Sequence, residues 1–239
     1  MSPPTLVVRP EPGNAATVAA GRLLGLAAHG FPLFEGCALA WDAPPAADYA
    51  ALLAGSAAAF RLGGPKLPLL TALPALAVGE ATAAAARAAG FTVAATGKGG
   101  LQALLDAADL PGGARLLRLA GEAHVPLAAP PGLALDTVIV YRIEPLPLPA
   151  AAAALLRDGA LVLLHSAEAA GHFRAECAAQ RLDRARIALA CLGPRVADAA
   201  GPGWAQVSSA SRPDDSALLA LAGEMCQSRR LWGRNDQNG

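Results

Sequence analysis

Residues 76–107 read LAVGEATAAAARAAGFTVAATGKGGLQALLDA, and residues 189–222 read LACLGPRVADAAGPGWAQVSSASRPDDSALLALA. Each stretch has an apolar strand, a glycine turn, an Ala-rich helix, a second short strand, a polar loop and a second helix. A second matched pair lies upstream, with ALLAGSAAAFRL at 51–62 and LVLLHSAEAAGHFRA at 161–175. The serines of this pair are 110 positions apart and the glycines of the first pair are 114 apart. A nearly constant offset across two blocks predicts an internal duplication.

Short apolar runs alternate with Ala-rich stretches along the whole chain, which predicts strands separated by helices. We expect strands near residues 5–9, 31–41, 49–54, 75–79, 92–96, 115–121, 136–143, 160–166, 187–193 and 205–209. We expect helices near residues 14–28, 57–62, 80–89, 99–108, 150–157, 167–181, 195–200 and 214–227. Such alternation is typical of parallel sheets covered on both faces, so the predicted class is α/β.

Two proline-rich stretches mark the expected change of domain: WDAPPAADY at 41–49 and RIEPLPLPA at 142–150. Closely spaced prolines forbid helix and favour extended backbone. We therefore predict an inserted domain 2 at 41–145 and a discontinuous domain 1 at 1–40 and 146–239. The fold would consist of two similar parallel-sheet lobes joined by two extended crossings.

The split copy of the repeat can be matched across the insertion, because TLVVRPEPGNA at 5–15 resembles RLLRLAGEAHV at 115–125. Two lobes joined in this way would form a cleft of variable width, which is a usual place for a ligand. The polar tail at 228–239 predicts a loose end without a function of its own.

Composition excludes several classes of protein. The chain has 239 residues, 54% of them hydrophobic, which is enough for two cores. It carries 19 Lys and Arg against 19 Asp and Glu, so neither a nucleic-acid stripe nor a membrane-surface patch is expected. Uncharged runs reach about 13 residues, fewer than the roughly 18 that a membrane span needs. The N-terminus lacks a charged and then apolar signal pattern, so we expect a cytoplasmic protein.

Several familiar chemistries lack their motifs. The cysteines are scattered without a Cys-x-x-Cys pair, and the histidines show no ligand spacing, so we expect no metal. TGKGG at 96–100 lacks the spacing of a phosphate loop, and the dinucleotide fingerprint Gly-x-Gly-x-x-Gly is absent, which argues against a Rossmann dehydrogenase. His165 and Ser166 are adjacent on a strand and point to opposite faces, which argues against a hydrolase.

In an open parallel sheet, a ligand binds beyond the carboxyl ends of the strands, where turns lead into helices. Backbone N–H groups at these turns would suit an anionic ligand. An alternative reading is that they are ordinary glycine turns and Ser or Thr helix caps. The turns concerned contain Arg9, Ser56, Gly79, Thr82, Gly121, Ser166 and Gly193.

An ordered set of short segments carries a family resemblance: VVRPEPGNA, LGLAAHGFPLF, GSAAAF, AVGEATAAAARAAGF, LLRLAGE, VIVYR, LLHSAEAAGHF and CLGPRVADAA. In this order the segments resemble uroporphyrinogen-III synthase over nearly the whole chain. The resemblance implies conversion of the linear tetrapyrrole hydroxymethylbilane to uroporphyrinogen III, with loss of water and inversion of the terminal pyrrole ring. It implies no metal and no organic cofactor. Hydroxymethylbilane synthase would supply the substrate, and a monomer is expected.

The resemblance also implies roles for individual residues. Tyr141 matches the family's tyrosine and would donate a proton to the leaving hydroxyl. Its alternative reading is a strand aromatic packed on the core. The substrate-binding positions implied are the hydroxyls of Ser56, Thr82 and Ser166 and the turns at Arg9, Gly79, Gly121 and Gly193.

This chain departs from the family where relatives have Ser-Ala-Asn-Ala, because it has Ala58 and Glu168 in place of both amides. Val196 stands where relatives have a hydroxyl. These departures leave open a second function, a non-catalytic two-lobe protein that binds a tetrapyrrole. Mutation of Tyr141 would separate the two, because an enzyme would lose turnover and keep binding.

Overall fold

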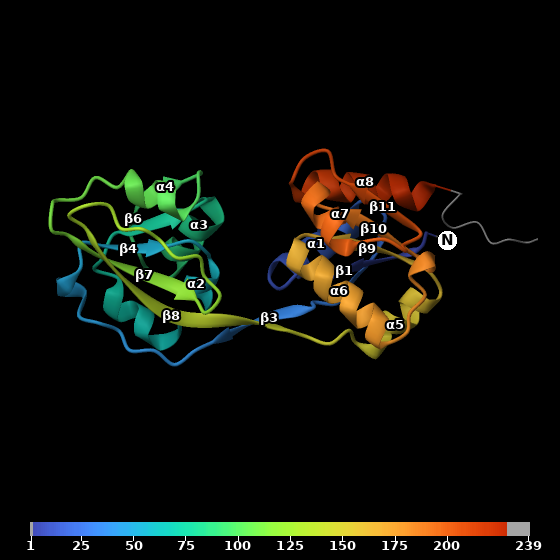
Figure 1. Cartoon of the computed structure of the whole chain (residues 1–239), viewed down its shortest axis with the longest axis horizontal. Helices are drawn as coiled ribbons and strands as arrows, with labels where there is room; N and C mark the ends of the chain where they lie inside the picture. The colour runs from blue at the N-terminus through green and yellow to red at the C-terminus, as the bar shows by residue number, and fades with distance from the viewer. Residues whose placement is uncertain (1, 229–239) are drawn as a thin grey trace, which may run out of the picture. The chain divides into compact units, whose positions relative to one another are not determined.

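The computed structural model describes residues 2–228, so the predicted loose tail from 229 onward lies outside the described residues. The chain divides into two compact units. Unit 1 comprises Met1–Glu35 and Pro145–Gly239, and unit 2 comprises Gly36–Glu144. Each unit has one sheet of parallel-paired strands covered by helices, so the predicted α/β fold is confirmed (Figure 1).

Unit 1 has five strands in the order β11-β10-β9-β1-β2, and all of their pairings are parallel. Its strands are β1 (Pro4–Val7), β2 (Ala27–Gly30), β9 (Ala160–Leu164), β10 (Ile187–Cys191) and β11 (Gln206–Ser209). Its helices are α1 (Gly13–Leu23), α5 (Ala150–Arg157), α6 (Ala167–Ala179), η3 (Arg184–Arg186), α7 (Pro194–Ala200) and α8 (Asp215–Gln227).

Unit 2 has a six-stranded sheet in the order β3-β8-β7-β4-β5-β6, in which β4 to β8 pair in parallel. Its strands are β3 (Phe34–Ala38), β4 (Ala51–Ala54), β5 (Ala75–Val78), β6 (Val93–Gly97), β7 (Arg115–Gly121) and β8 (Ala134–Pro145). Its helices are η1 (Ala46–Asp48), α2 (Ala58–Leu62), η2 (Gly64–Leu70), α3 (Glu80–Ala88) and α4 (Leu101–Asp106).

The two sheets repeat one topology. The order β11-β10-β9-β1-β2 of unit 1 corresponds strand for strand to β6-β5-β4-β7-β8 of unit 2. The helices that follow β9, β10 and β11 correspond to those that follow β4, β5 and β6. The connection after the fourth strand in each order differs between the units: α1 follows β1, whereas β7 is followed by a loop without helix that leads directly to β8.

The structure corrects the predicted match of the split copy by one residue. Val7 pairs with Leu163 of β9, and Arg118 pairs with Leu53 of β4. Leu163 and Leu53 are equivalent in the repeat, so Val7 is equivalent to Arg118. The sequence match set Val8 against Arg118 instead. Because a shift of one residue moves a side chain to the other face of a sheet, this correction decides which face Arg118 occupies.

The central strand of unit 1 shows why its residues are apolar throughout. Ala160, Val162 and Leu164 of β9 pack against α5, α6 and α7 on one face. Leu161 and Leu163 pack against α1 and α8 on the other. Successive strand residues point to opposite faces, and helices cover both, so no position of β9 tolerates a polar side chain without loss of packing.

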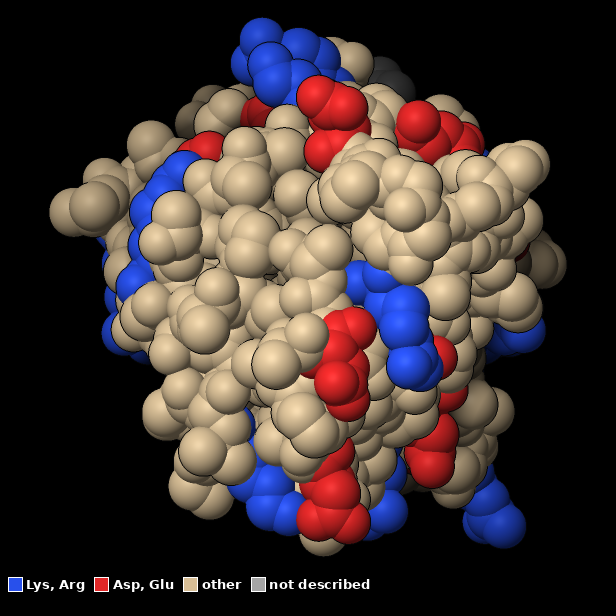
Figure 2. All heavy atoms as spheres, turned by 90° about the vertical axis from the view of Figure 1, so that its left-hand side faces the viewer, with Lys and Arg blue, Asp and Glu red and all other residues tan. Residues whose placement is uncertain are grey.

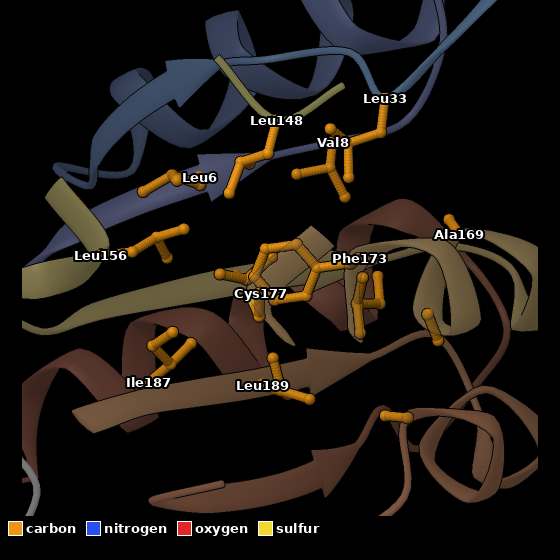
Figure 3. Close-up of a cluster of buried hydrophobic side chains, with 14 of the residues drawn as sticks. Leu6, Val8, Leu33, Leu148, Leu156, Ala169, Phe173, Cys177, Ile187 and Leu189 are labelled. Atoms are coloured by element: carbon orange, nitrogen blue, oxygen red, sulfur yellow. The ribbon is translucent and has the colours of Figure 1, made fainter. Parts of the chain in front are cut away.

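Phe173 of α6 lies at the centre of the larger core cluster of unit 1, among side chains from the sheet and from α5 (Figure 3). It is fully buried and stacks on Trp204, with ring centroids 5.5 Å apart. Below it, Cys177 and Ile187 complete the packing. The burial of these groups contributes to the stability of this unit.

Two predicted elements near the N-terminus need correction. The helix expected at 14–28 ends at Leu23, and residues 27–30 form β2 beside β1. Gly25 adopts φ +81°, a left-handed conformation that ends the helix. The strand expected at 31–41 is confined to β3, because residues 31–33 are not part of a strand.

The first proline-rich stretch lies within unit 2. The chain passes from unit 1 to unit 2 between Glu35 and Gly36, inside β3, which is the neighbour of β8 in the sheet. Trp41 is buried in the core of unit 2, and its Nε1 donates a hydrogen bond of 2.8 Å to the carbonyl of Gly63. β3 and β8 carry the chain from one unit to the other (Figure 1).

Replacing Leu156 by Ala tests the core of unit 1. Leu156 of α5 is 1% exposed, and we expect a loss of about 2–5 kcal/mol in the free energy of unfolding. Leu23→Ala is the matched control, because Leu23 of α1 is 89% exposed and its loss should cost less than about 0.5 kcal/mol. Hydrogen exchange of the amides of β9 and β10 measures the difference. Equal protection in both variants would contradict this packing.

Candidate active site

Unit 2 contains a cavity of about 450 Å³ at the carboxyl ends of β4 and β7 and beside β8. This is the edge at which ligands bind in parallel α/β sheets, and the volume lies within the range of small-molecule sites. Three of the predicted site residues, Ser56, Gly121 and Tyr141, line it together. The other lining residues are Gly55, Gly99, Gly100, Leu101, Gln102, Arg118, Leu119, Ala120, Ala123, His124, Val125, Pro126 and Leu127.

Tyr141 lies directly against the backbone of Gly121. A Cβ atom added to Gly121 would lie 2.7 Å from Cζ of Tyr141 and 3.0 Å from its hydroxyl. The pairing of β7 with β8 shifts register at this point, so that Gly121 opposes Tyr141 while Ala120 opposes Ile139. The extra residue turns the strand locally, and only glycine leaves room for the phenol. Gly121 is therefore required by the position of Tyr141.

Ser56 stands between β4 and α2. Its hydroxyl oxygen accepts a hydrogen bond of 3.2 Å from the amide of Ala58, so it satisfies a donor at the start of the helix. The residue is half-buried and also lines the cavity. Ala57 is the N-cap of α2, so Ser56 lies one residue before the cap, and its hydroxyl can accept the bond from Ala58 and still donate another to a ligand.

Two cavity residues were not singled out in the sequence. Arg118 of β7 is 5% exposed, and its Nη1 donates to the carbonyl of Val125 at 2.9 Å. Nδ1 of His124 lies 2.8 Å from the carbonyl of Gly121. In the sequence, Arg118 stands between leucines in an apolar run. Only knowledge of the sheet face on which it lies would have identified it as a cavity residue.

Gly79 and Thr82 lie outside the residues that line this cavity. Gly79 adopts φ +76° at the start of α3, a conformation that favours glycine. Thr82 is 4% exposed and lies in the first turn of α3. Their predicted contact with substrate stays a prediction.

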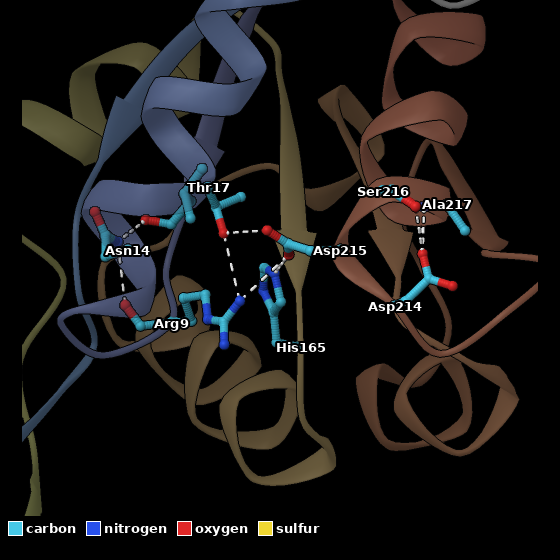
Figure 4. A network of polar contacts seen from close by, with 9 residues as sticks. Arg9, Asn14, Thr17, His165, Asp214, Asp215, Ser216 and Ala217 are labelled. Carbon is cyan, nitrogen blue, oxygen red and sulfur yellow. Dashed lines mark hydrogen bonds and ion pairs between the residues drawn. The ribbon is translucent and has the colours of Figure 1, made fainter. Parts of the chain in front are cut away.

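In unit 1, the predicted residue Arg9 belongs to a network of polar contacts (Figure 4). Its Nη1 lies 3.3 Å from Oδ1 of Asp215 at the start of α8. The hydroxyl of Thr17 donates to Oδ2 of Asp215 at 2.7 Å, and Nε2 of His165 lies 2.8 Å from Oδ1. Arg9 is therefore already paired with a carboxylate inside its own unit.

Burial sets the protonation of this network. It lowers the pKa of His165, whose side chain is 9% exposed, and the hydrogen bond to Asp215 only partly opposes this. Burial alone would raise the pKa of Asp215, but hydrogen bonds from Thr17 and His165 outweigh it, and the net pKa is lowered. At neutral pH, His165 is therefore neutral and donates to an ionised Asp215.

Ser166 and Gly193 start the helices that follow β9 and β10. The hydroxyl oxygen of Ser166 accepts a hydrogen bond of 3.1 Å from the amide of Ala169, so Ser166 caps α6. Gly193 is extended and precedes Pro194, the first residue of α7. β9 ends at Leu164, so His165 and Ser166 follow the strand and do not lie on it as predicted; their hydrogen-bond partners are Asp215 and Ala169.

Charge on the visible surface is mixed. On the face drawn in Figure 2, basic and acidic side chains are scattered over a largely uncharged surface, without an extended basic area on that face. Among the described residues, no helix is both long and apolar enough to cross a membrane.

The duplicated sheets and the cavity at a carboxyl edge define the class: a two-unit α/β protein with a cavity at the edge where such sheets commonly bind small ligands. The particular family follows from comparison. The family model described as uroporphyrinogen-III synthase HemD matches residues 16–220, and the chain belongs to this family.

Comparison with one solved structure agrees on the fold. Uroporphyrinogen-III synthetase from Helicobacter pylori 26695 is 19% identical, with a TM-score of 0.63 over 94% of this chain and 100% of that chain. A mutant uroporphyrinogen III synthase from Thermus thermophilus is 18% identical, with a TM-score of 0.48 over 95% of this chain and 100% of that one. No curated protein matches the chain.

Membership identifies the chain as an enzyme of heme biosynthesis that acts on a small-molecule tetrapyrrole. Its reaction is the cyclisation of hydroxymethylbilane to uroporphyrinogen III, and the non-catalytic alternative is not favoured.

Gly121→Ala should lower turnover, because the added methyl group would collide with the Tyr141 phenol and displace it. Since the family resemblance implies that Tyr141 is the proton donor, we expect kcat to fall by about 100-fold or more. Gly112→Ala is the matched control, because a Cβ at Gly112 meets nothing within 4 Å. Steady-state rates of both variants decide the matter. An unimpaired Gly121→Ala enzyme would show that the phenol needs no such placement.

The lowered pKa of His165 predicts a pH dependence of stability. At pH values between the lowered pKa of His165 in the folded protein and its ordinary pKa of 6.5, the unfolded chain binds more protons than the folded chain does. Stability should therefore fall as the pH drops from about 7 to 5, by at most about 1.4 kcal/mol per pH unit from this one group. His165→Gln should flatten this slope in urea unfolding followed by circular dichroism. An identical slope in the variant would assign it to other groups.

Proposed function

We propose that the chain carries out its cyclisation as a lyase, with Tyr141 as the proton donor to the leaving hydroxyl. One observation carries this assignment: the Tyr141 phenol lines a cavity at the carboxyl ends of β4 and β7, and no Asp or Glu is among the described lining residues. His124 also lines the cavity and could donate a proton; we assign this role to Tyr141 because it matches the tyrosine of the family resemblance.

The first step is the loss of the hydroxyl group. Proton transfer from Tyr141 and cleavage of the carbon–oxygen bond give water, the phenolate of Tyr141 and an azafulvenium cation. The substituted carbon of the terminal ring then attacks to form a spiro intermediate, which fragments and recloses with that ring inverted. The carbon that forms the last bond loses a hydrogen ion, and this proton restores the phenol. The atoms therefore balance with water as the only other product.

Positioning supplies the remainder of the catalysis. Unaided closure gives the non-inverted isomer, so the protein must favour attack at the more crowded carbon by restricting the terminal ring. Gly121 and Ser56 are proposed to contact the substrate in the cavity. Gly79 and Thr82 of unit 2, and Arg9, Ser166 and Gly193 of unit 1, are proposed as further contacts through backbone or hydroxyl groups. Such donors suit the eight carboxylates of the substrate.

We place this activity in the cytoplasm, in a monomer supplied by hydroxymethylbilane synthase. The four cysteines all lie in the described part of the chain and form no disulfide, which suits a reducing compartment. Burial raises the pKa of Cys177 and of Cys191 to about 12, so both are inert thiols at neutral pH. A single chain holds both copies of the repeat, which supports the monomer.

Tyr141→Phe tests the role of the phenol. We expect kcat to fall by about 100- to 10,000-fold with little change in substrate affinity, because the change removes one hydroxyl. The chain's other tyrosine gives a matched control: Tyr49 donates to Asp136 at 2.9 Å and is not among the residues that line the cavity. Tyr49→Phe should retain wild-type turnover.

The measurement generates hydroxymethylbilane in situ, oxidises the products and separates uroporphyrin I from uroporphyrin III. The wild type should give mainly isomer III, and Tyr141→Phe should give mainly isomer I from unaided closure. If the sample with wild-type protein gives isomer I at the rate seen without protein, the proposed function is refuted. Full activity of Tyr141→Phe would leave the function standing and remove Tyr141 from it.

A further inference from the structure

Arg118 is a buried cation without an anionic partner. It is 5% exposed, its Nε is buried, and this Nε has no hydrogen-bond partner among residues 2–228. None of the ion pairs within the described chain includes it. Arg115, three residues earlier on the same strand, pairs with Asp136 at 2.6 Å. A buried guanidinium left unpaired is costly, so its presence calls for a reason.

The surroundings of Arg118 are suited to an anion. Arg118 lines the cavity together with Tyr141, Ser56 and His124, and no carboxylate is found among the described lining residues. Burial lowers the pKa of the Arg118 guanidinium, while the nearby Tyr141 phenol acts in the opposite direction. Arginine nevertheless stays protonated at neutral pH. The cavity wall therefore carries a fixed positive charge.

The comparison of the two units shows how this cavity arose. Val7, the equivalent of Arg118, is fully buried in the cluster that includes Val18 of α1. Unit 2 has no helix at the position of α1 in its repeat, and the loop after β7 contributes the carbonyl of Val125 to Arg118. Where unit 1 has apolar packing, unit 2 has a cavity with a guanidinium in its wall.

We infer that this cavity is a carboxylate subsite, in which Arg118 pairs with an acetate or propionate side chain of one pyrrole ring of the substrate. The inference rests on the proposed function for the identity of the ligand. Arg118 lines the cavity, its buried Nε has no hydrogen-bond partner within the described chain, and a guanidinium matches the planar geometry of a carboxylate. One ring held by its acid side chain beside Tyr141 would have its orientation fixed.

Binding of uroporphyrin III, the oxidised and stable form of the product, tests the subsite without turnover. Porphyrin fluorescence gives the Kd at constant ionic strength. Arg118→Met should raise the Kd by about 10- to 100-fold, as expected for loss of a charged hydrogen bond. Arg118→Lys should lie between it and the wild type, because it keeps the charge and loses the planar fork. Arg115→Met is the control on the same strand and should bind as the wild type does.

Thermal unfolding distinguishes a ligand contact from a structural clamp. Arg118→Met removes a buried unpaired charge, so its Tm should equal or exceed that of the wild type. A lower Tm with an unchanged Kd would show that Arg118 only holds the loop at Val125, and would overturn the inference. If Arg118→Met fails to fold, the Kd of Arg118→Lys tests the inference instead. Wild-type affinity in Arg118→Lys would also overturn the inference. Absence of saturable binding to the wild type would do the same.

The isomer assay separates this inference from the function on which it rests. If the wild type produces isomer III and Arg118→Met binds uroporphyrin III as tightly as the wild type does, the proposed function stands and the carboxylate subsite is refuted. If the wild type produces no isomer III but its binding of uroporphyrin III depends on Arg118, the subsite stands and the proposed reaction is refuted.

Discussion

Parallel strand pairing is the constraint on which both the fold and the site depend. Parallel neighbours must be joined by long connections, which in this chain are mostly helices, and these helices bury both faces of each sheet. The same pairing collects the carboxyl ends of the strands along one edge. Ser56, Gly121 and Tyr141 are far apart in sequence, yet they line one cavity because β4 and β7 end near one another and Tyr141 of β8 pairs with Gly121. The apolar character of the strands and the location of the cavity thus have a common cause.

Duplication explains the architecture, and divergence between the copies explains the cavity. Two units with one strand order could have been equally packed. The connection between β7 and β8 lacks the helix that joins β1 to β2, so one face of the unit 2 sheet near Arg118 is covered by a loop instead. In unit 1 the corresponding edge is closed by the network of Arg9, Thr17, His165 and Asp215. The two copies of the fold therefore differ in what covers the carboxyl edge of the sheet: a polar network in unit 1 and a loop in unit 2.

The sequence predicted those parts of the structure that depend on local pattern. The strand at 115–121 and the helix at 150–157 have the predicted bounds, because an uninterrupted apolar run and an Ala-rich stretch leave little choice. The helix expected at 14–28 was too long, since AAHG at 27–30 carries no strand signal and becomes β2 through pairing with β1. Arg118 was missed for a related reason. Its importance depends on the register of β7 against β4 and on an absent helix, and neither is a property of the residues around it.

The nesting of one unit in the other bears on the order in which the chain can fold as it leaves the ribosome. β1 precedes unit 2 in the chain, yet its neighbour β9 begins only at Ala160, after the whole of unit 2 has been synthesised. All strands of unit 2 lie in one continuous stretch and can pair first. The N-terminal strand meanwhile has only β2 as a partner, with one edge open to unwanted pairing. Nascent chains that end between β2 and β9 should therefore be the ones that depend most on chaperones.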